Sequence, residues 1–339
     1  MRRRGWTVLM GAVLAAFLVF LIGQAPVRYV ILGPGPTFNT LGQYDGKSVI
    51  QVTGKPTTTS DGQLRMVTVN ITDNITLLEA MKAWFDPHEK VVPRELIYPP
   101  DQSNQQVEQE NKEAFTASQS SAETVALREL GFPVFVTVTD VVADGASAGK
   151  LQKGDVIATV DGTPVTSAQK LQDLVRGKPA GSTLAVGRTR DGATETVQIT
   201  TKAADDGTPR IGVSVDNKQP HDGIDITYHL ENVGGPSAGL MFTLGTIDVL
   251  KPEDLTGGKV IAGTGTIDDE GNVGIIGGIA QKLVGAKDDK ATYFLTPAGN
   301  CAEAKANAVD GLTLVKVDTI DSALTALEEI RDGKPTPAC

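Results

Sequence analysis

Residues 274 to 286 read GIIGGIAQKLVGA, an apolar stretch with a single charged residue, Lys282. Apolar residues recur after Gly277-Gly278 at helical spacing, so the pattern predicts a helix that carries this lysine. A lysine in such surroundings must be buried in its neutral form, paired with another group, or extended toward the helix end. Strand-like and helix-like runs alternate from about Pro209 to the C-terminus, which is typical of an α/β or α+β unit.

Ser237 is the residue that gives this lysine a chemical role. It lies in GPSAG at 235–239, which fits the G-x-S-x-G nucleophile elbow of α/β hydrolases. That fold places its histidine after the serine, whereas every histidine of this chain precedes Ser237: His88, His221 and His229. A triad with His221 or His229 stays open as an alternative, but triad members so close to the serine in sequence would be unusual.

A lysine can serve as the base for a serine when burial lowers its pKa. Lys282 is the lysine after Ser237 that lies among apolar residues, so we expect the two to act as a pair. Ser237 begins an apolar helix, whose first backbone N–H groups can stabilise an oxyanion. The oxyanion and positioning groups are expected among its neighbours and one threonine: Gly235, Pro236, Ala238 and Thr264.

The segment 264–282 reads TGTIDDEGNVGIIGGIAQK and fits the pattern T-G-x-I-x-x-x-G-x-V-x-x-I-G-G-I-x-x-K without a gap. Pro297-x-x-Asn300 with Glu303 fits P-x-x-N-x-x-D less closely. Together with GPSAG at 235–239, these motifs resemble the active-site region of the Lon proteolytic family. The resemblance covers about residues 209–332 and implies a serine endopeptidase with a Ser237–Lys282 dyad, with no cofactor and no metal.

Two features depart from that family. Its serine loop often carries an aspartate three residues before the serine, where this chain has Gly234. The nearest match to an ATPase P-loop is GQYDGKS at 42–48, which has one spacer too few and reads as a turn before a strand. The resemblance therefore implies an ATP-independent protease that cleaves unfolded or flexible polypeptides. Lon-type domains tend to form rings, so a homo-oligomer is a further expectation.

A second unit is predicted over residues 126–203. Strand-like runs, a short helix and a hairpin turn at Asp191-Gly192 mark it as a small β-rich module. The string LQKGDVIATVDG at 151–162 resembles the signature of a bacterial PDZ domain. That resemblance implies a groove for polypeptides, including C-termini, and places it near four residues: Leu130, Gly131, Phe132 and Leu171.

The N-terminus has the pattern of a membrane anchor. Three arginines at 2–4 precede the uncharged run GWTVLMGAVLAAFLVFLIG at 5–23. Such a run is long enough to cross a bilayer, and arginines on the short side predict a cytoplasmic N-terminus. We expect a cytoplasmic tail and transmembrane signal anchor over 1–25, with a lipid bilayer as partner of residues 5–23. The protein would then be a single-pass cell-membrane protein with its catalytic part outside the cytoplasm. A cleaved signal peptide is the alternative.

Charge and cysteine content exclude some functions. A net charge of -10 argues against a nucleic-acid partner, and an aromatic content of 5% argues against base stacking. The two cysteines, Cys301 and Cys339, are too few for a disulfide framework or a four-ligand metal site. We expect a small buried thiol at Cys301 and a free thiol at the C-terminus.

Residues 26–125 are expected to form an N-terminal extracytoplasmic region. It contains strand patterns at 47–53 and 64–71, a helix over 72–85 capped by Asp73 or Asn74, and a polar connector or solvated helix at 99–120. If these strands join the sheet of the Lon-like domain at 204–335, the PDZ module is an insertion in a discontinuous domain. The prediction is an α+β chain that acts as a membrane-anchored endopeptidase. The rival is a catalytically silent PDZ scaffold or adaptor.

Overall fold

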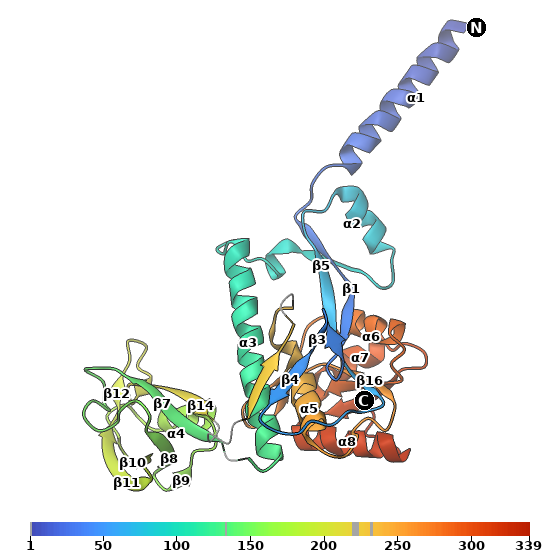
Figure 1. Cartoon of the computed structure of the whole chain (residues 1–339). Coiled ribbons are helices and arrows are strands. Elements are labelled where there is room, and N and C mark those ends of the chain that lie inside the picture. The colour runs from blue at the N-terminus through green and yellow to red at the C-terminus, as the bar shows by residue number, and fades with distance from the viewer. Residues whose placement is uncertain (1, 133, 219–223, 231–232) are drawn as a thin grey trace.

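The computed structural model describes residues 2–132, 134–218, 224–230 and 233–339, and it contains two main sheets (Figure 1). The first sheet has the strand order β20-β19-β16-β5-β1-β6. Strands β5, β16, β19 and β20 run parallel, and β1 pairs antiparallel with both β5 and β6. The bounds are β1 Tyr29–Asn39, β5 Gln63–Thr72, β6 Lys90–Pro93, β16 Val260–Gly263, β19 Tyr293–Pro297 and β20 Thr313–Val317.

The pairing of β5 with β16 joins segments that lie far apart in the sequence. Gln63 is paired with Val260 and Met66 with Gly263. The PDZ-like segment lies between these strands along the chain, so the first sheet is built from residues on both sides of it. This is the discontinuous arrangement that the sequence left open.

Helices cover both faces of the first sheet because its strands are apolar on both sides. Successive residues of β5 face opposite cores: Met66 packs with the cluster that contains Phe242, whereas Val67 packs with the cluster that contains Leu283. Helices α3, α5 and α8 cover the first face, and α6 and α7 cover the second. Their bounds are α3 Asn104–Glu129, α5 Gly239–Leu250, α6 Ile279–Asp288, α7 Cys301–Ala306 and α8 Ile320–Asp332.

The second sheet has the order β11-β10-β8-β7-β14, with the short strand β9 paired to β8. Its core packs Val136, Ile157 and Val186 against Leu171 of α4. The bounds are β7 Phe135–Val141, β8 Val156–Val160, β9 Thr163–Pro164, α4 Ala168–Arg176, β10 Thr183–Arg190, β11 Ala193–Thr200 and β14 Val213–Lys218. The sheet thus continues past residue 203, because β14 forms its edge beside β7.

Shorter elements complete the chain. The strand pairs are β2 Gln43–Tyr44 with β3 Lys47–Ser48, β4 Ile50–Thr53 with β15 Asp225–Tyr228, β12 Lys202–Ala203 with β13 Pro209–Arg210, and β17 Thr266–Ile267 with β18 Val273–Gly274. The 3-10 turns are η1 Arg94–Leu96, η2 Pro236–Ala238 and η3 Ala298–Asn300. Residues 42–48 form the β2–β3 turn and not a phosphate-binding loop that opens a helix.

Two helices differ from the sequence-based prediction. Helix α2 spans Leu77–Trp84 and is capped by Thr76 in a capping box with Glu79, because β5 continues to Thr72. The predicted caps Asp73 and Asn74 therefore lie in the turn before it. Residues 104–120 are helical, which confirms the solvated-helix alternative for most of 99–120, but they continue without a break into the following segment, since α3 is one helix of 26 residues that begins after Ser103.

Helix α1 covers Arg2–Gly23 and projects away from the sheets (Figure 1). A bilayer crossing takes about 20 mostly apolar residues in one helix. Among the residues that the structure describes, none of the helices combines the length and apolar character that such a crossing requires. This finding contradicts the predicted transmembrane anchor over 1–25, and with it the bilayer partner of residues 5–23 and the single-pass location.

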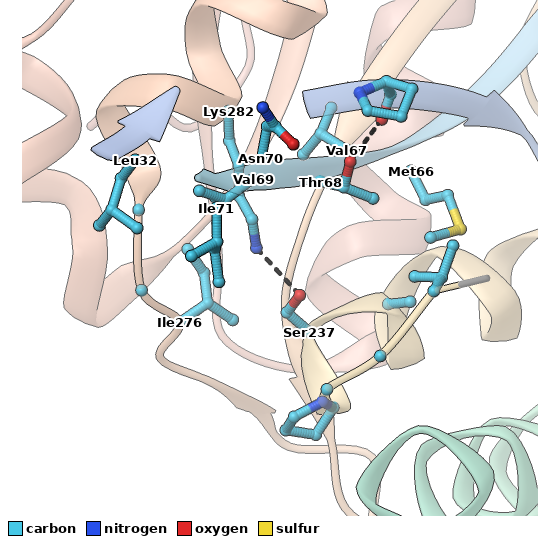
Figure 2. A pocket seen from close by; sticks show the side chains of 18 of the residues that line it. Leu32, Met66, Val67, Thr68, Val69, Asn70, Ile71, Ser237, Ile276 and Lys282 are labelled. Atoms are coloured by element: carbon cyan, nitrogen blue, oxygen red, sulfur yellow. Dashed lines mark hydrogen bonds between the residues drawn. The ribbon is translucent and has the colours of Figure 1, made fainter. Parts of the chain in front are cut away.

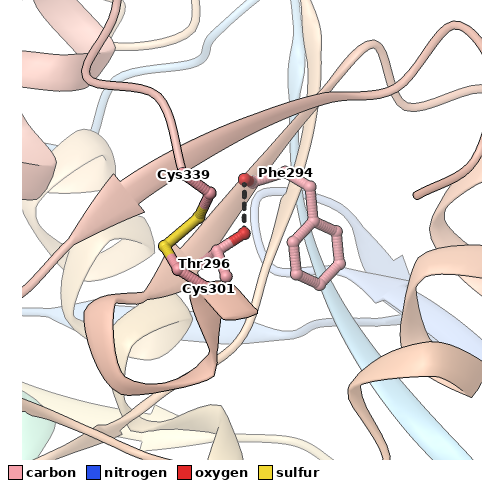
Figure 3. Close-up of a disulfide and its surroundings, with 4 residues drawn as sticks. All are labelled: Phe294, Thr296, Cys301 and Cys339. Atoms are coloured by element: carbon pink, nitrogen blue, oxygen red, sulfur yellow. Dashed lines mark hydrogen bonds between the residues drawn. A yellow bond between two sulfur atoms is a disulfide. The ribbon is translucent and has the colours of Figure 1, made fainter. Parts of the chain in front are cut away.

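Cys301 and Cys339 form a disulfide, so the expectation of two free thiols is wrong (Figure 3). The C-terminal segment returns along β20, where Ala338 bridges Val315. This return brings Cys339 to the start of α7, with 5.1 Å between the two Cα atoms. The sequence gives no local signal for it, because the two cysteines are 38 positions apart.

Replacing Cys339 with serine should lower the free energy of unfolding by about 2 kcal/mol, because the crosslink restricts the unfolded chain. Urea titration under non-reducing conditions measures the change. Wild-type protein in excess reductant is the control and should unfold at the same urea concentration as the variant. Equal stability of the variant and the oxidised wild type would contradict the prediction.

Candidate functional site

Ser237 lies in the turn that opens α5. Gly235 has a φ of 85°, a left-handed conformation that side chains disfavour, and Pro236 follows at the first position of the η2 turn. Helix α5 is buried along most of its length and holds Phe242 in the core of the first face. The serine is thus fixed by a rigid element at the edge of a cleft.

Lys282 lies on α6 and reaches across to Ser237 (Figure 2). Its Nζ is 2.9 Å from Ser237 Oγ and 3.0 Å from Thr264 Oγ1. Thr264 Oγ1 donates to the carbonyl oxygen of Ser237 at 3.0 Å, so it accepts from the amine and fixes the amine's position. Gly278 caps α6 in a left-handed conformation, and a Cβ there would lie 2.6 Å from a methyl group of Val69. The glycine therefore allows α6 to approach β5.

Burial changes the acidity of the lysine. The side chain is 3% exposed, and it lies on a helix packed against the apolar second face. Desolvation disfavours the ammonium form and lowers the pKa of Lys282 to about 8. An amine with that pKa is partly neutral near physiological pH and can accept a proton from the serine hydroxyl.

The predicted oxyanion residues differ in whether their backbone N–H groups are free to donate. The N–H of Gly235 donates to Asn111 O at 2.9 Å, so it is already used, and Pro236 has no N–H. Both residues shape the loop, but they do not supply a donor for an oxyanion. The serine lies in the 3-10 turn Pro236–Ala238, in which the N–H of Ala238 faces the carbonyl oxygen of Gly235, three residues before it. The N–H of Ser237 precedes the first such bond and is the candidate oxyanion donor.

Gly234 has a structural explanation. A Cβ at this position would lie 3.2 Å from the Cβ of Asn111 on α3. The same stretch of α3 accepts the Gly235 N–H, so the helix lies against the serine loop. The space for the aspartate of the Lon-type loop is therefore restricted by α3, and a glycine fits beside it.

A cleft of about 880 Å³ leads to Ser237 and Lys282. Strand β5 forms one wall and the loop before α6 forms another (Figure 2). Apolar side chains dominate the lining, including Leu32, Phe38, Met66, Val69, Ile71 and Ile276. The cleft is therefore suited to an extended, largely apolar polypeptide segment.

One edge of β5 faces this cleft. Gln63 N–H donates to Lys259 O on the β16 side, and backbone groups alternate along a strand, so those of Val67 and Val69 point the same way. Strand β16 ends at Gly263, opposite Met66. Within the described part of the chain, no strand pairs with this edge of β5 beyond Met66.

Asn300 has a role that the sequence motif did not specify. Its side-chain amide accepts from the N–H of Ile276 and donates to the carbonyl oxygen of the same residue, both at 2.9 Å. It thereby holds the loop that lines the cleft before α6. Of the two histidines of the triad alternative, His229 forms a hydrogen bond with Gln51 Oε1 at 2.9 Å through its ring, and His221 lies outside the described residues.

The predicted peptide-binding residues of the PDZ module are not brought together. Leu130 and Phe132 pack against the first-face core, next to the C-terminal end of α3, and Gly131 turns the chain there. Leu171 is buried in the core of the second sheet instead. The groove near these four residues stays a prediction; beside β7 the edge of this sheet is β14, which lies beyond residue 203.

The comparisons with known proteins concern this second sheet. The family model described as PDZ domain matches residues 106–201. The PDZ domain of an SdrC-like protein from Listeria monocytogenes is 30% identical, covering 24% of this chain and 85% of that one, with a TM-score of 0.23. A protein of Geobacillus thermodenitrificans is 29% identical over 24% of this chain and 94% of that one, with a TM-score of 0.22.

The chain therefore contains a PDZ domain, which the family model places within residues 106–201. Members of that family bind extended polypeptides by strand addition.

Proposed function

We propose that the protein is an ATP-independent serine endopeptidase in which Ser237 is the nucleophile and Lys282 is the general base. One observation carries the proposal: a buried lysine amine with a lowered pKa lies 2.9 Å from a serine hydroxyl. Desolvation of the lysine costs stability, and such a cost is typical of functional sites. The motif resemblance to Lon proteolytic domains supports the same assignment.

The proton transfers can be written step by step. Neutral Lys282 takes the proton of Ser237 as Oγ attacks the peptide carbonyl, and the N–H of Ser237 stabilises the oxyanion. The C–N bond then breaks, and the protonated lysine gives its proton to the leaving amine. Water attacks the acyl ester, again with Lys282 as base, which releases the acid and restores the serine.

The open edge of β5 gives the substrate a place to bind. An extended polypeptide can pair with the carbonyl oxygen of Val67 and the backbone of Val69 and present a carbonyl to Ser237. Only an unfolded or flexible segment can adopt this extended form. The substrate class is therefore polypeptide without stable structure at the cleavage point.

The PDZ domain supplies a second polypeptide site. Strand β14 is the edge of its sheet, and α4 packs beside β13 and β14. A peptide added to β14 would lie between β14 and α4, which is the arrangement of strand-addition binding. This favours a second candidate function, a scaffold that binds polypeptides without cleaving them.

Incubation of the full chain with unfolded casein, without nucleotide, separates the two functions. We expect casein fragments with the wild type and none with Ser237→Ala. His229→Ala should cleave like the wild type, because its ring contacts Gln51 and not the serine. A wild type that binds casein but leaves it intact would contradict the protease and favour the scaffold.

A further inference from the structure

The hairpin formed by β17 and β18 spans the distance between the PDZ domain and Ser237. Its turn is built by Asp268, whose carboxylate accepts from the N–H groups of Glu270 and Asn272. The two residues at the tip, Asp269 and Glu270, form side-chain hydrogen bonds with residues outside the hairpin.

Asp269 is fixed by groups from both units of the chain. One of its carboxylate oxygens accepts from Ser121 Oγ of α3 at 2.7 Å, and the other accepts from Asn217 Nδ2 of β14 at 2.9 Å. Its carbonyl oxygen accepts from Arg128 at 2.6 Å. Asn217 also accepts from the N–H of Ala168, the first residue of α4, at 2.7 Å.

Glu270 contacts the other side of the PDZ groove. It accepts from Ser167 Oγ at 2.5 Å, and Ser167 is the buried residue that caps α4. The tip of the hairpin therefore touches β14 through Asn217 and α4 through Ser167. These are the two elements between which the proposed PDZ ligand lies.

The base of the same hairpin contacts the nucleophile. Gly265 N–H donates to the carbonyl oxygen of Ser237 at 3.0 Å, and Leu240 N–H donates to Gly265 O at 3.1 Å. A Cβ on Gly239 would lie 2.7 Å from Ile267 of β17, so α5 and the hairpin are in close contact. A small shift of the hairpin must therefore move the start of α5, because packed interiors transmit displacement.

We propose that Asp269 and Glu270 are positioning residues, through which the β14–α4 side of the PDZ domain sets the placement of Ser237. The inference rests on the proposed protease function. In this arrangement the PDZ domain aligns the nucleophile by holding the hairpin tip, and a polypeptide bound between β14 and α4 acts on the same contacts. Loosening the tip lowers the rate of acylation and leaves the cleft that binds substrate unchanged.

The test exchanges the amide of Asn217 and the carboxylate of Asp269, which are hydrogen-bonded to each other. Asn217→Asp places two carboxylates against each other and should lower kcat about tenfold on a short capped apolar peptide, with KM unchanged, because small misplacements of a nucleophile are costly. In the double variant Asn217→Asp with Asp269→Asn, the carboxylate is at position 217 and the amide at position 269. An amide–carboxylate hydrogen bond can form again, so kcat should return to near the wild-type value. Thr196→Asp is the matched control, since it adds a charge at an exposed position of β11, at the opposite edge of the same sheet, and should change nothing.

A second variant and a direct measurement of Ser237 reactivity test the same inference independently. Glu270→Ala removes the contact to Ser167 and should also lower kcat without raising KM, and thermal unfolding shows whether each variant is folded. The rate of Ser237 modification by phenylmethanesulfonyl fluoride should fall in parallel with kcat. Unchanged kcat in Asn217→Asp, or no recovery in the double variant, would overturn the inference. An inactive wild type would overturn the proposed function instead.

Discussion

Replacement of Lys282 with methionine should abolish proteolysis and at the same time stabilise the fold at neutral pH. Removal of a general base lowers the rate by about 10²–10⁴. Serine alone is a poor nucleophile, so we expect a loss of at least about 10³ in kcat/KM on unfolded casein or a short peptide. Methionine has a similar length and no charge, so it can occupy the apolar side of α6 without the ammonium.

The stability gain follows from the direction of the pKa shift. The pKa of Lys282 is about 8 in the folded protein and near 10.5 when the side chain is exposed. Below pH 8 the lysine is protonated in both the folded and the unfolded protein. The folded protein then bears the full free-energy cost of burying the ammonium group. That cost is relieved as pH rises from about 8 to 10.5, where the folded state loses its proton first. At pH 7 the methionine variant should therefore gain on the order of 1–3 kcal/mol, measured by urea unfolding.

Two variants serve as controls for this pair of effects. Ser237→Ala should be equally inactive but should not gain stability to the same extent, because the buried lysine remains. Lys282→Arg should be inactive and no more stable, since arginine keeps its charge at every relevant pH. Proteolysis that survives in Lys282→Met would exclude the dyad, and an inactive but destabilised variant would exclude the buried-charge argument.

The proximity of Ser237 and Lys282 could be predicted from the sequence because its signals are local. Ser237 follows two glycines and a proline at the start of an apolar helix, and Lys282 is the charged residue of an apolar one. Thr264 could be assigned for the same reason, as it precedes Lys282 in one continuous motif. The structure brings these three side chains within hydrogen-bond distance.

The free backbone N–H groups of the serine loop, the edge strand of the PDZ sheet and the disulfide depend on tertiary contacts, which the sequence does not signal. The N–H of Gly235 is lost to Asn111, a residue of a polar helix that had been read partly as a connector. The PDZ edge strand β14 lies after a turn region that marked the expected end of the module. The disulfide required the return of the C-terminus along β20. None of these contacts leaves a periodic or spaced pattern in the chain.

The rate of cleavage should rise with pH between about 7 and 9. With the pKa of Lys282 near 8, about a tenth of the lysine is neutral at pH 7 and about nine tenths at pH 9, so kcat/KM should increase roughly tenfold. A profile of kcat/KM on a short peptide, measured from pH 6 to 10, should show one limb with a midpoint near pH 8. The modification of Ser237 by phenylmethanesulfonyl fluoride should follow the same limb.

Glu123 also titrates close to this pH range, so its ionisation has to be distinguished from that of Lys282. Burial, with Asp225 and Asp216 nearby, raises its pKa to about 7, so its ionisation disfavours the folded state progressively as pH rises from about 4.5 to 7. That effect is opposite in sign, since it lowers stability with rising pH, and it is nearly complete before Lys282 titrates. Glu123→Gln should therefore flatten the stability profile below pH 7 and leave the midpoint of kcat/KM near 8. A midpoint that moves with Glu123→Gln, or a rate that is flat from pH 7 to 9, would show that Lys282 is not the base.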